Sequence, residues 1–95
     1  MVELDPEIKE FLEAGVKLIL RHPRKYLQEF TKFLLHFKVR PEIENILAFI
    51  AGDMYGTADT LYMRKYGRPM LDEEKVQLLN FIANELRKVR QTFSK

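Results

Sequence analysis

The residue types that most often carry chemistry are few in this sequence, and they do not stand at catalytic spacings. The two histidines, His22 and His36, lie outside any HxxxH, HExxH or ExxH pattern, the spacings that bring metal ligands together on one helix face. Lys25 and Lys32 lie near His36 on the same predicted helix, and their positive charges would repel a metal ion. The sequence therefore predicts no metal site and no cofactor.

Enzymatic catalysis is not predicted either. The chain has no cysteine, which excludes disulfides, thiolate metal sites and thiol nucleophiles. No nucleophile stands beside a base, no glycine-rich loop joins a strand to a helix, and no helix face gathers several carboxylates. Asp53 is a candidate ligand or base, but pairing with Arg64, Arg21 or a backbone donor is the more ordinary expectation. A small-molecule pocket beside Asp53 and Tyr55 stays open as an alternative.

Lysines and arginines form two groups that suit contact with nucleic-acid phosphates, which requires several cations on one surface. The groups lie around the start of the second predicted helix and late in the fourth: Arg21, Arg24 and Lys25, then Arg87, Lys88, Arg90 and Lys95. The cations of the second helix point in different directions, and no recognition motif is present. A nucleic-acid-binding accessory protein is therefore the second hypothesis.

Formal charge alternates in sign along the chain, although the net charge is only +2. Residues 1–20 hold five acidic and two basic side chains, and residues 21–40 hold one acidic and six basic. Residues 41–62 hold four acidic and no basic side chains, and residues 63–95 hold four acidic and eight basic. This alternation favours attraction between neighbouring helices, and a divided nucleic-acid surface is the alternative.

Length and composition indicate one domain, 1–95. A chain of 95 residues with 46% hydrophobic side chains can bury a core, and this length suits a single domain. The longest apolar run, residues 46–51, is too short to span a bilayer, and no apolar signal segment is visible near the start. We therefore expect a cytoplasmic protein with no membrane partner. The many Lys, Arg and Glu residues would suit a thermophilic source.

Proline, glycine and capping residues divide the chain into four predicted helices. The helix boundaries are expected at Asp5-Pro6, His22-Pro23, Arg40-Pro41, Gly67 and Asp72. Pro41 is expected to start the third helix, which ends at Tyr66. Asp72 is expected to cap the fourth helix, with Leu71 contacting Val76 across its first turn.

Each predicted helix has one apolar face at helical spacing. In chain order these faces are Ile8, Phe11, Leu12, Gly15, Val16 and Ile19; Tyr26, Leu27, Phe30, Phe33, Leu34 and Phe37; Ile43, Ile46, Leu47, Ile50, Met54, Ala58 and Leu61; and Leu79, Ile82, Leu86, Val89 and Phe93. The three phenylalanines of the second helix predict a large share of the core.

The third helix has two unusual edges. Gly52 and Gly56 lie in mid-helix, where each costs roughly 0.5–1 kcal/mol relative to alanine. They share a face with Phe49 and Met63, opposite the core face. We expect a second copy of the chain to pack there, with Phe81 as a further apolar contact. The alternatives are that this face lies inside the monomer or that the two glycines have no role.

The other edge holds Tyr55, Asp59, Tyr62 and Tyr66. It predicts tyrosines that lie over a neighbouring helix with their hydroxyls in water, and stacking on bases or a peptide is the alternative.

These patterns predict an all-α, four-helix up-down bundle in which two shorter helices pack on two longer antiparallel helices. The expected function is a non-enzymatic protein-interaction module. It is expected to form a homodimer through Phe49, Gly52, Gly56, Met63 and Phe81.

Overall fold

Residues 3–94 are described by a computed structural model, in which they fold into four α-helices and no strand. The helices are α1 (Pro6–Arg21), α2 (Pro23–His36), α3 (Ile43–Tyr66) and α4 (Asp72–Phe93). Two are short, with 16 and 14 residues, and two are long, with 24 and 22 residues. The predicted all-α class with four helices is confirmed. Met1, Val2 and Lys95, the last of which belongs to the second basic group, lie outside the described residues.

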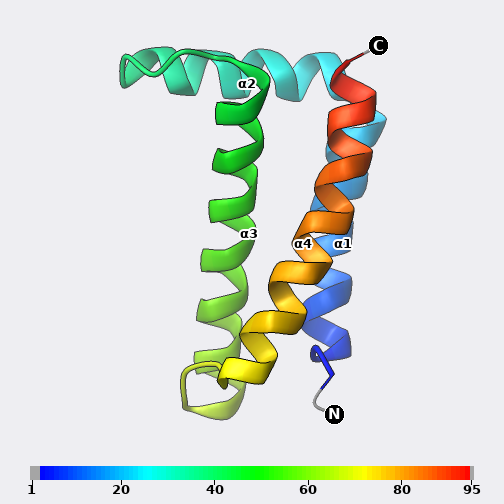
Figure 1. Ribbon diagram of the computed structural model, residues 1–95, viewed down its shortest axis with the longest axis vertical. Helices are drawn as coiled ribbons and strands as arrows, with labels where there is room; N and C mark the ends of the chain where they lie inside the picture. Colours follow the sequence, from blue (N-terminus) through cyan, green and yellow to red (C-terminus); the bar gives the residue numbers. More distant parts are fainter. Residues whose placement is uncertain (1–2, 95) are drawn as a thin grey trace.

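Three helices run side by side, and α2 lies across one end of them (Figure 1). α3 is antiparallel to α4, its most extensive partner, and α1 packs against both. The crosswise course of α2 is the one departure from an up-down arrangement. Only His22 separates α1 from α2. Because Pro23 disfavours helical geometry at His22, the chain turns sharply there without the loop that a full reversal of direction would need.

The start of α1 is as predicted. Asp5 caps the helix: its Oδ1 accepts hydrogen bonds from the backbone N–H groups of Glu7 at 3.0 Å and Ile8 at 3.1 Å. Pro6 occupies the first helical position, where its missing N–H costs nothing.

The prediction for the start of α4 was wrong. Leu71 is the capping residue, and Asp72 is already the first residue of the helix. The backbone N–H of Leu71 donates instead to Oε1 of Glu74 at 2.8 Å, which is half of a capping box. Leu71 and Val76, which were expected to contact each other, are both about half exposed.

The boundary between α2 and α3 also differs from the prediction. α2 ends at His36, and the backbone N–H of Val39 then donates to the carbonyl of Leu34 at 2.9 Å. Lys38 has φ of +61° and takes the left-handed position that glycine usually fills in this kind of helix end. α3 begins at Ile43. Pro41, which was expected to start this helix, therefore belongs to the connection and not to the first turn.

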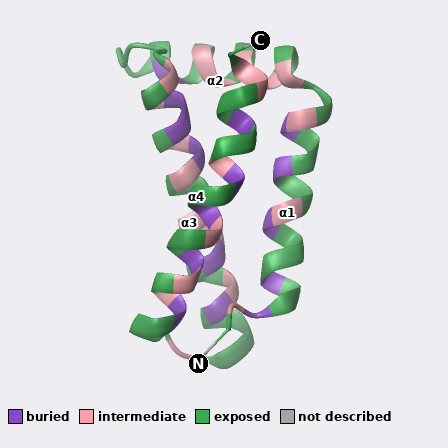
Figure 2. Ribbon diagram, turned by 45° about the vertical axis from the view of Figure 1, so that its right-hand side comes forward, coloured by how far each residue is buried: buried purple, intermediate pink, exposed green. Residues whose placement is uncertain are grey.

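The core lies between α1, α3 and α4, with α2 closing one end (Figure 2). Its buried apolar members come from every helix and from the α3–α4 connection: Ile8, Leu12, Val16, Ile19, Leu34, Ile46, Leu47, Ile50, Met54, Ala58, Tyr62, Met70, Leu78, Ile82 and Val89. Most of the predicted apolar faces of α1 and α3 are therefore confirmed.

Five residues of the predicted apolar faces are exposed instead, and one of them is Gly15. Phe11 is 60% exposed, Phe33 46%, Phe37 60% and Leu79 54%. On α2 only Leu34 is fully buried, because α2 reaches across the end of the bundle and touches it along one narrow strip. The large loss of stability expected for removing a buried aromatic ring therefore does not apply to Phe33.

Candidate functional site

Aromatic side chains gather where α2 crosses the start of α3. Phe33 packs against Phe49 of α3 with ring centroids 4.7 Å apart and ring planes tilted by 35°, and the ring of Phe30 lies 5.6 Å from the same ring. Phe37 extends the group, at 5.0 Å from Phe33. We call these four residues the aromatic corner. Its outer members are about half exposed, so the corner presents uncovered apolar surface beside α3.

The bare backbone of α3 adjoins this corner. Phe49, Gly52, Gly56 and Met63 follow one another at i, i+3, i+7 and i+14, which places them along one side of the helix. No neighbouring side chain or helix lies within 4 Å of the position that a Cβ would take at either glycine. Met63 is 48% exposed. We call Gly52, Gly56 and Met63 the glycine face; because it is open, its assignment to the monomer interior is excluded.

The structure does not place all five predicted interface residues on this surface. Phe81 lies on α4, half-buried, with the ammonium of Lys9 5.9 Å from its ring centroid. It therefore belongs to the contact between α4 and α1. Phe33 and Phe37 take its place beside Phe49, and the sequence pointed to them only as core residues.

A groove lies between α1 and α3 beneath α2. It has a volume of about 270 Å³ and an apolar floor that includes Val16, Ile50 and Met54. Phe11, Tyr26, Phe30 and Phe49 contribute aromatic walls, and Asp53 and Thr57 line its polar edge. A groove beside Asp53, where the sequence left a small-molecule pocket open as an alternative, is thus present, but Tyr26 and not Tyr55 lines it.

Asp53 does not form the ion pairs that were expected for it. Across residues 3–94 neither an ion pair nor a side-chain hydrogen bond is found at this carboxylate. Arg64 lines a second, more open hollow on the surface. This hollow shares Phe11, Asp53 and Thr57 with the groove.

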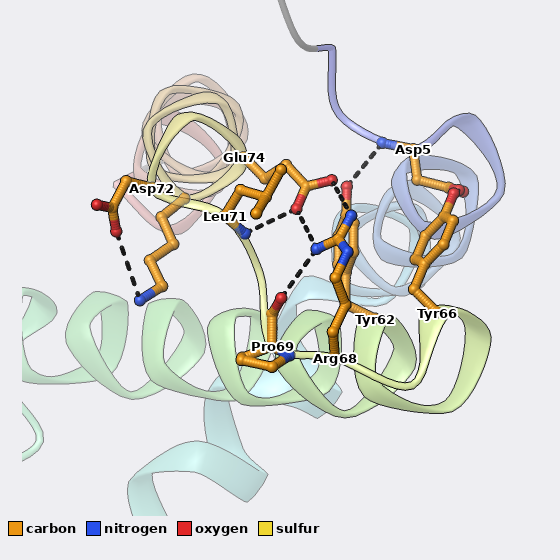
Figure 3. Close-up of polar contacts among 9 residues, drawn as sticks. Asp5, Tyr62, Tyr66, Arg68, Pro69, Leu71, Asp72 and Glu74 are labelled. Atoms are coloured by element: carbon orange, nitrogen blue, oxygen red, sulfur yellow. Dashed lines mark hydrogen bonds and ion pairs between the residues drawn. The ribbon is translucent and has the colours of Figure 1, made fainter.

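A polar cluster joins the start of α1 to the end of α3 (Figure 3). The backbone N–H of Asp5 donates to the hydroxyl of Tyr62 at 2.9 Å, and the hydroxyl of Tyr66 donates to Oδ2 of Asp5. The ammonium of Lys65 lies 2.9 Å from the same oxygen. We call these four residues the Asp5 clamp. The prediction that these tyrosine hydroxyls lie in water was wrong, because both bind Asp5.

The Asp5 clamp changes the acidity of its carboxylate. Burial of Asp5 by itself raises the pKa. The hydrogen bonds from Tyr66, Lys65 and the backbone of Ile8, with the charge of Lys65, outweigh burial and lower the pKa from 3.8 to about 2. The same contact with Asp5 raises the pKa of Tyr66 and of Lys65. Asp5 is therefore ionised at neutral pH and serves as a structural anion rather than as a general acid.

A partly buried ion pair closes the α3–α4 connection next to the Asp5 clamp (Figure 3). The guanidinium of Arg68 donates to both carboxylate oxygens of Glu74, at 2.9 and 3.3 Å. Arg68 also donates to the carbonyl of Pro69 at 2.8 Å and lies 5.1 Å from the ring centroid of Tyr66. Arg68 lowers the pKa of Glu74. These contacts fix the turn that joins α3 to α4.

The two basic groups belong to helices that come together at one end of the molecule. α2, whose first turn carries Arg24 and Lys25, crosses the end at which α4 finishes (Figure 1), and Arg87 belongs to the second half of α4. Two of the cations in the second group are paired. Lys88 binds Glu85 at 3.2 Å, and Arg90 binds Glu44 at 3.4 Å.

The apolar spacing of the sequence did not predict that Tyr62, Glu74 and Glu85 are buried. Glu85 is a carboxylate on the core side of α4, held by Lys88. The spacing of Glu74 after Leu71 is a partial capping signal that could have located the first of these carboxylates. Nothing comparable in the sequence marks Glu85.

Among the described side chains no group of three or more histidines, aspartates or glutamates is placed to hold a metal ion. None of the helices within residues 3–94 combines the length and apolar character needed to cross a bilayer. Comparisons with protein-family models, curated proteins and solved structures found no significant match to this chain.

Proposed function

We propose that this chain is a non-enzymatic protein-interaction module that self-associates through the aromatic corner and the glycine face. The observation that carries the proposal is the uncovered pair Phe33 and Phe37, packed beside the bare backbone of α3. Aromatic side chains are enriched in the energetic centres of protein interfaces. A large exposed apolar patch on a small domain is typical of a binding surface.

The glycine face supports a helix as the partner element. Glycine in an exposed mid-helix position lowers helix stability by roughly 0.5–1 kcal/mol relative to alanine, and here no neighbour within 4 Å accounts for either glycine. Absence of a side chain lets a second helix approach the backbone closely. A second copy of α3 has the same bare strip, so a twofold dimer can pair the two faces.

Light scattering on matched variants tests this proposal. Gly56→Leu should convert the dimer to a monomer, because the added side chain separates the two backbones, while helix content stays nearly unchanged. Phe37→Ser should weaken the dimer in the same way by removing an interface anchor, by at least about tenfold in dissociation constant.

Leu79→Ser is the control, because Leu79 is similarly exposed but lies on α4. It should leave the dimer intact. A wild-type protein that is monomeric at about 100 μM would contradict the proposal, since specific dimers commonly bind more tightly than this.

A second candidate function is binding of a nucleic-acid backbone. It is favoured by the position of the two basic groups on helices that come together at the α2 end of the molecule. Because Lys88 and Arg90 already have carboxylate partners, we expect binding that is weak, independent of sequence and strongly weakened by salt.

Electrophoretic shift assays at two salt concentrations measure this binding. The Arg24→Glu, Lys25→Glu variant should lower the affinity and the salt slope together. An affinity tighter than about 1 μM at physiological salt exceeds ordinary non-specific binding and would make nucleic-acid recognition the leading function.

A further inference from the structure

The groove between α1 and α3 combines aromatic walls with a carboxylate at its edge. Its walls carry the aromatic rings of Phe11, Tyr26, Phe30 and Phe49, and its floor is aliphatic. Its polar edge carries a carboxylate, Asp53, which has no cation bound to it among the residues that the structure describes. The electron-rich faces of aromatic rings and a carboxylate both attract positive charge.

We infer that this groove binds an organic cation, with its apolar body on the aliphatic floor and its ammonium group near Asp53. The chemical class is a primary or substituted amine attached to an aromatic or aliphatic group. This site borders the self-association surface, because Phe30 and Phe49 belong both to the groove and to the aromatic corner.

The size of the groove suits such a ligand. An enclosed apolar cavity of roughly 150 Å³ holds benzene, and this groove measures about 270 Å³. A single ring with a short alkyl chain therefore fits, and its charged end reaches the polar edge where Asp53 and Thr57 stand. Thr57 adds a hydroxyl that can accept a hydrogen bond from an ammonium group.

The charges of the groove select against other ligands. An anionic ligand of the same shape would meet the carboxylate of Asp53 without a compensating cation, because Arg64 lines the adjoining hollow and not the groove itself. A neutral ligand would gain the apolar contacts only. The ammonium of Lys25 lies 5.4 Å from the ring centroid of Tyr26, but neither Lys25 nor any other lysine of residues 3–94 lines the groove.

Three matched ligands test the inference by nuclear magnetic resonance titration of the full chain: phenylbutylammonium, phenylbutanol and phenylbutyrate. They differ only in the terminal group. A ligand of this size should bind with a dissociation constant on the order of 1 mM. The ammonium should bind about five- to tenfold more tightly than the alcohol, from one exposed ion pair and ring contacts, and the carboxylate should bind most weakly. The backbone chemical-shift changes on titration should cluster at Gly15, Phe49 and Asp53, which line the groove.

Two variants and a control locate the effect. Asp53→Asn should reduce the preference for the ammonium over the alcohol to within about twofold. Asp59→Asn, which removes an exposed carboxylate of the same helix outside the groove, should leave that preference unchanged. Gly15→Leu should weaken all three ligands by filling the groove, and it should fold because open space surrounds Gly15.

Equal binding of ammonium and alcohol would overturn the inference, and so would saturable shifts confined to other surfaces or no binding at about ten times the expected dissociation constant. The titrations should give the same result in the Phe37→Ser background, which weakens the dimer at a residue outside both the groove and the adjoining hollow, so failure of the dimer proposal and failure of this one are distinguishable.

Discussion

Leu78→Ala should lower the free energy of unfolding by about 2.7–5 kcal/mol, the range for removing a fully buried leucine from a packed core. Leu78 is 0% exposed, whereas its neighbour Leu79 is 54% exposed. The cost combines the lost burial of the side chain with the cavity left between α4 and the helices that it packs against. Urea unfolding followed by circular dichroism measures it.

Leu79→Ala is the matched control, because it removes the same atoms one residue further along the same helix. It should cost no more than about 0.5 kcal/mol, as is usual for a surface position. The heptad pattern of α4 predicted the opposite order. If Leu79→Ala proved the more destabilising variant, the observed orientation of α4 would be wrong.

Asp5→Ala should be the second strongly destabilising change, at about 2–4 kcal/mol. It removes the helix cap of α1, worth about 1 kcal/mol, and it leaves the hydroxyl of Tyr66 and the ammonium of Lys65 without their shared acceptor. Asp72→Ala is the control, since Asp72 also stands at a helix start. Its side chain is exposed, and its ion pair with Lys75 is long, at 4.0 Å. It should change stability by no more than about 0.5 kcal/mol.

The effect of Asp5 should depend on pH in a defined direction. Its pKa is lowered from 3.8 to about 2, so its stabilising effect is fully present above pH 3.8 and is lost as the pH falls towards 2 and below. The lost contribution is about 2 kcal/mol, from 1.36 kcal/mol per pKa unit. Stability of the wild type relative to Asp5→Ala should therefore decline in that window. A difference that stays constant down to pH 2 would contradict the Asp5 clamp.

Local signals were enough to predict the helices. Proline at the first helical position and glycine after the last one act through backbone sterics that need no partner. For this reason Asp5-Pro6 and Gly67 gave correct boundaries. Lys38 shows where such reasoning stops: it takes a left-handed conformation that favours glycine, because the Leu34 carbonyl and the Val39 N–H close the end of α2 around it.

Periodicity gave the apolar side of each helix but not how much of that side is covered. Phe33 and Phe37 lie on the apolar side of α2, yet only a helix that runs alongside the bundle would bury that side completely. The sharp turn at His22 sends α2 across the end instead, and the two rings remain exposed. In the same way, period alone could not decide between Leu78 and Leu79.

What the sequence by itself determined is therefore the number of helices, most of their ends, and the contrast between the core face of α3 and its glycine face. These follow from backbone geometry and from 3.6-residue spacing, which are properties of adjacent residues. Only the tertiary structure decided that Tyr62 and Tyr66 hold Asp5, 57 and 61 residues away, and that Asp53 stands unpaired beside rings from three helices. Such contacts depend on the angle at which whole helices cross, and no local pattern in the chain specifies that angle.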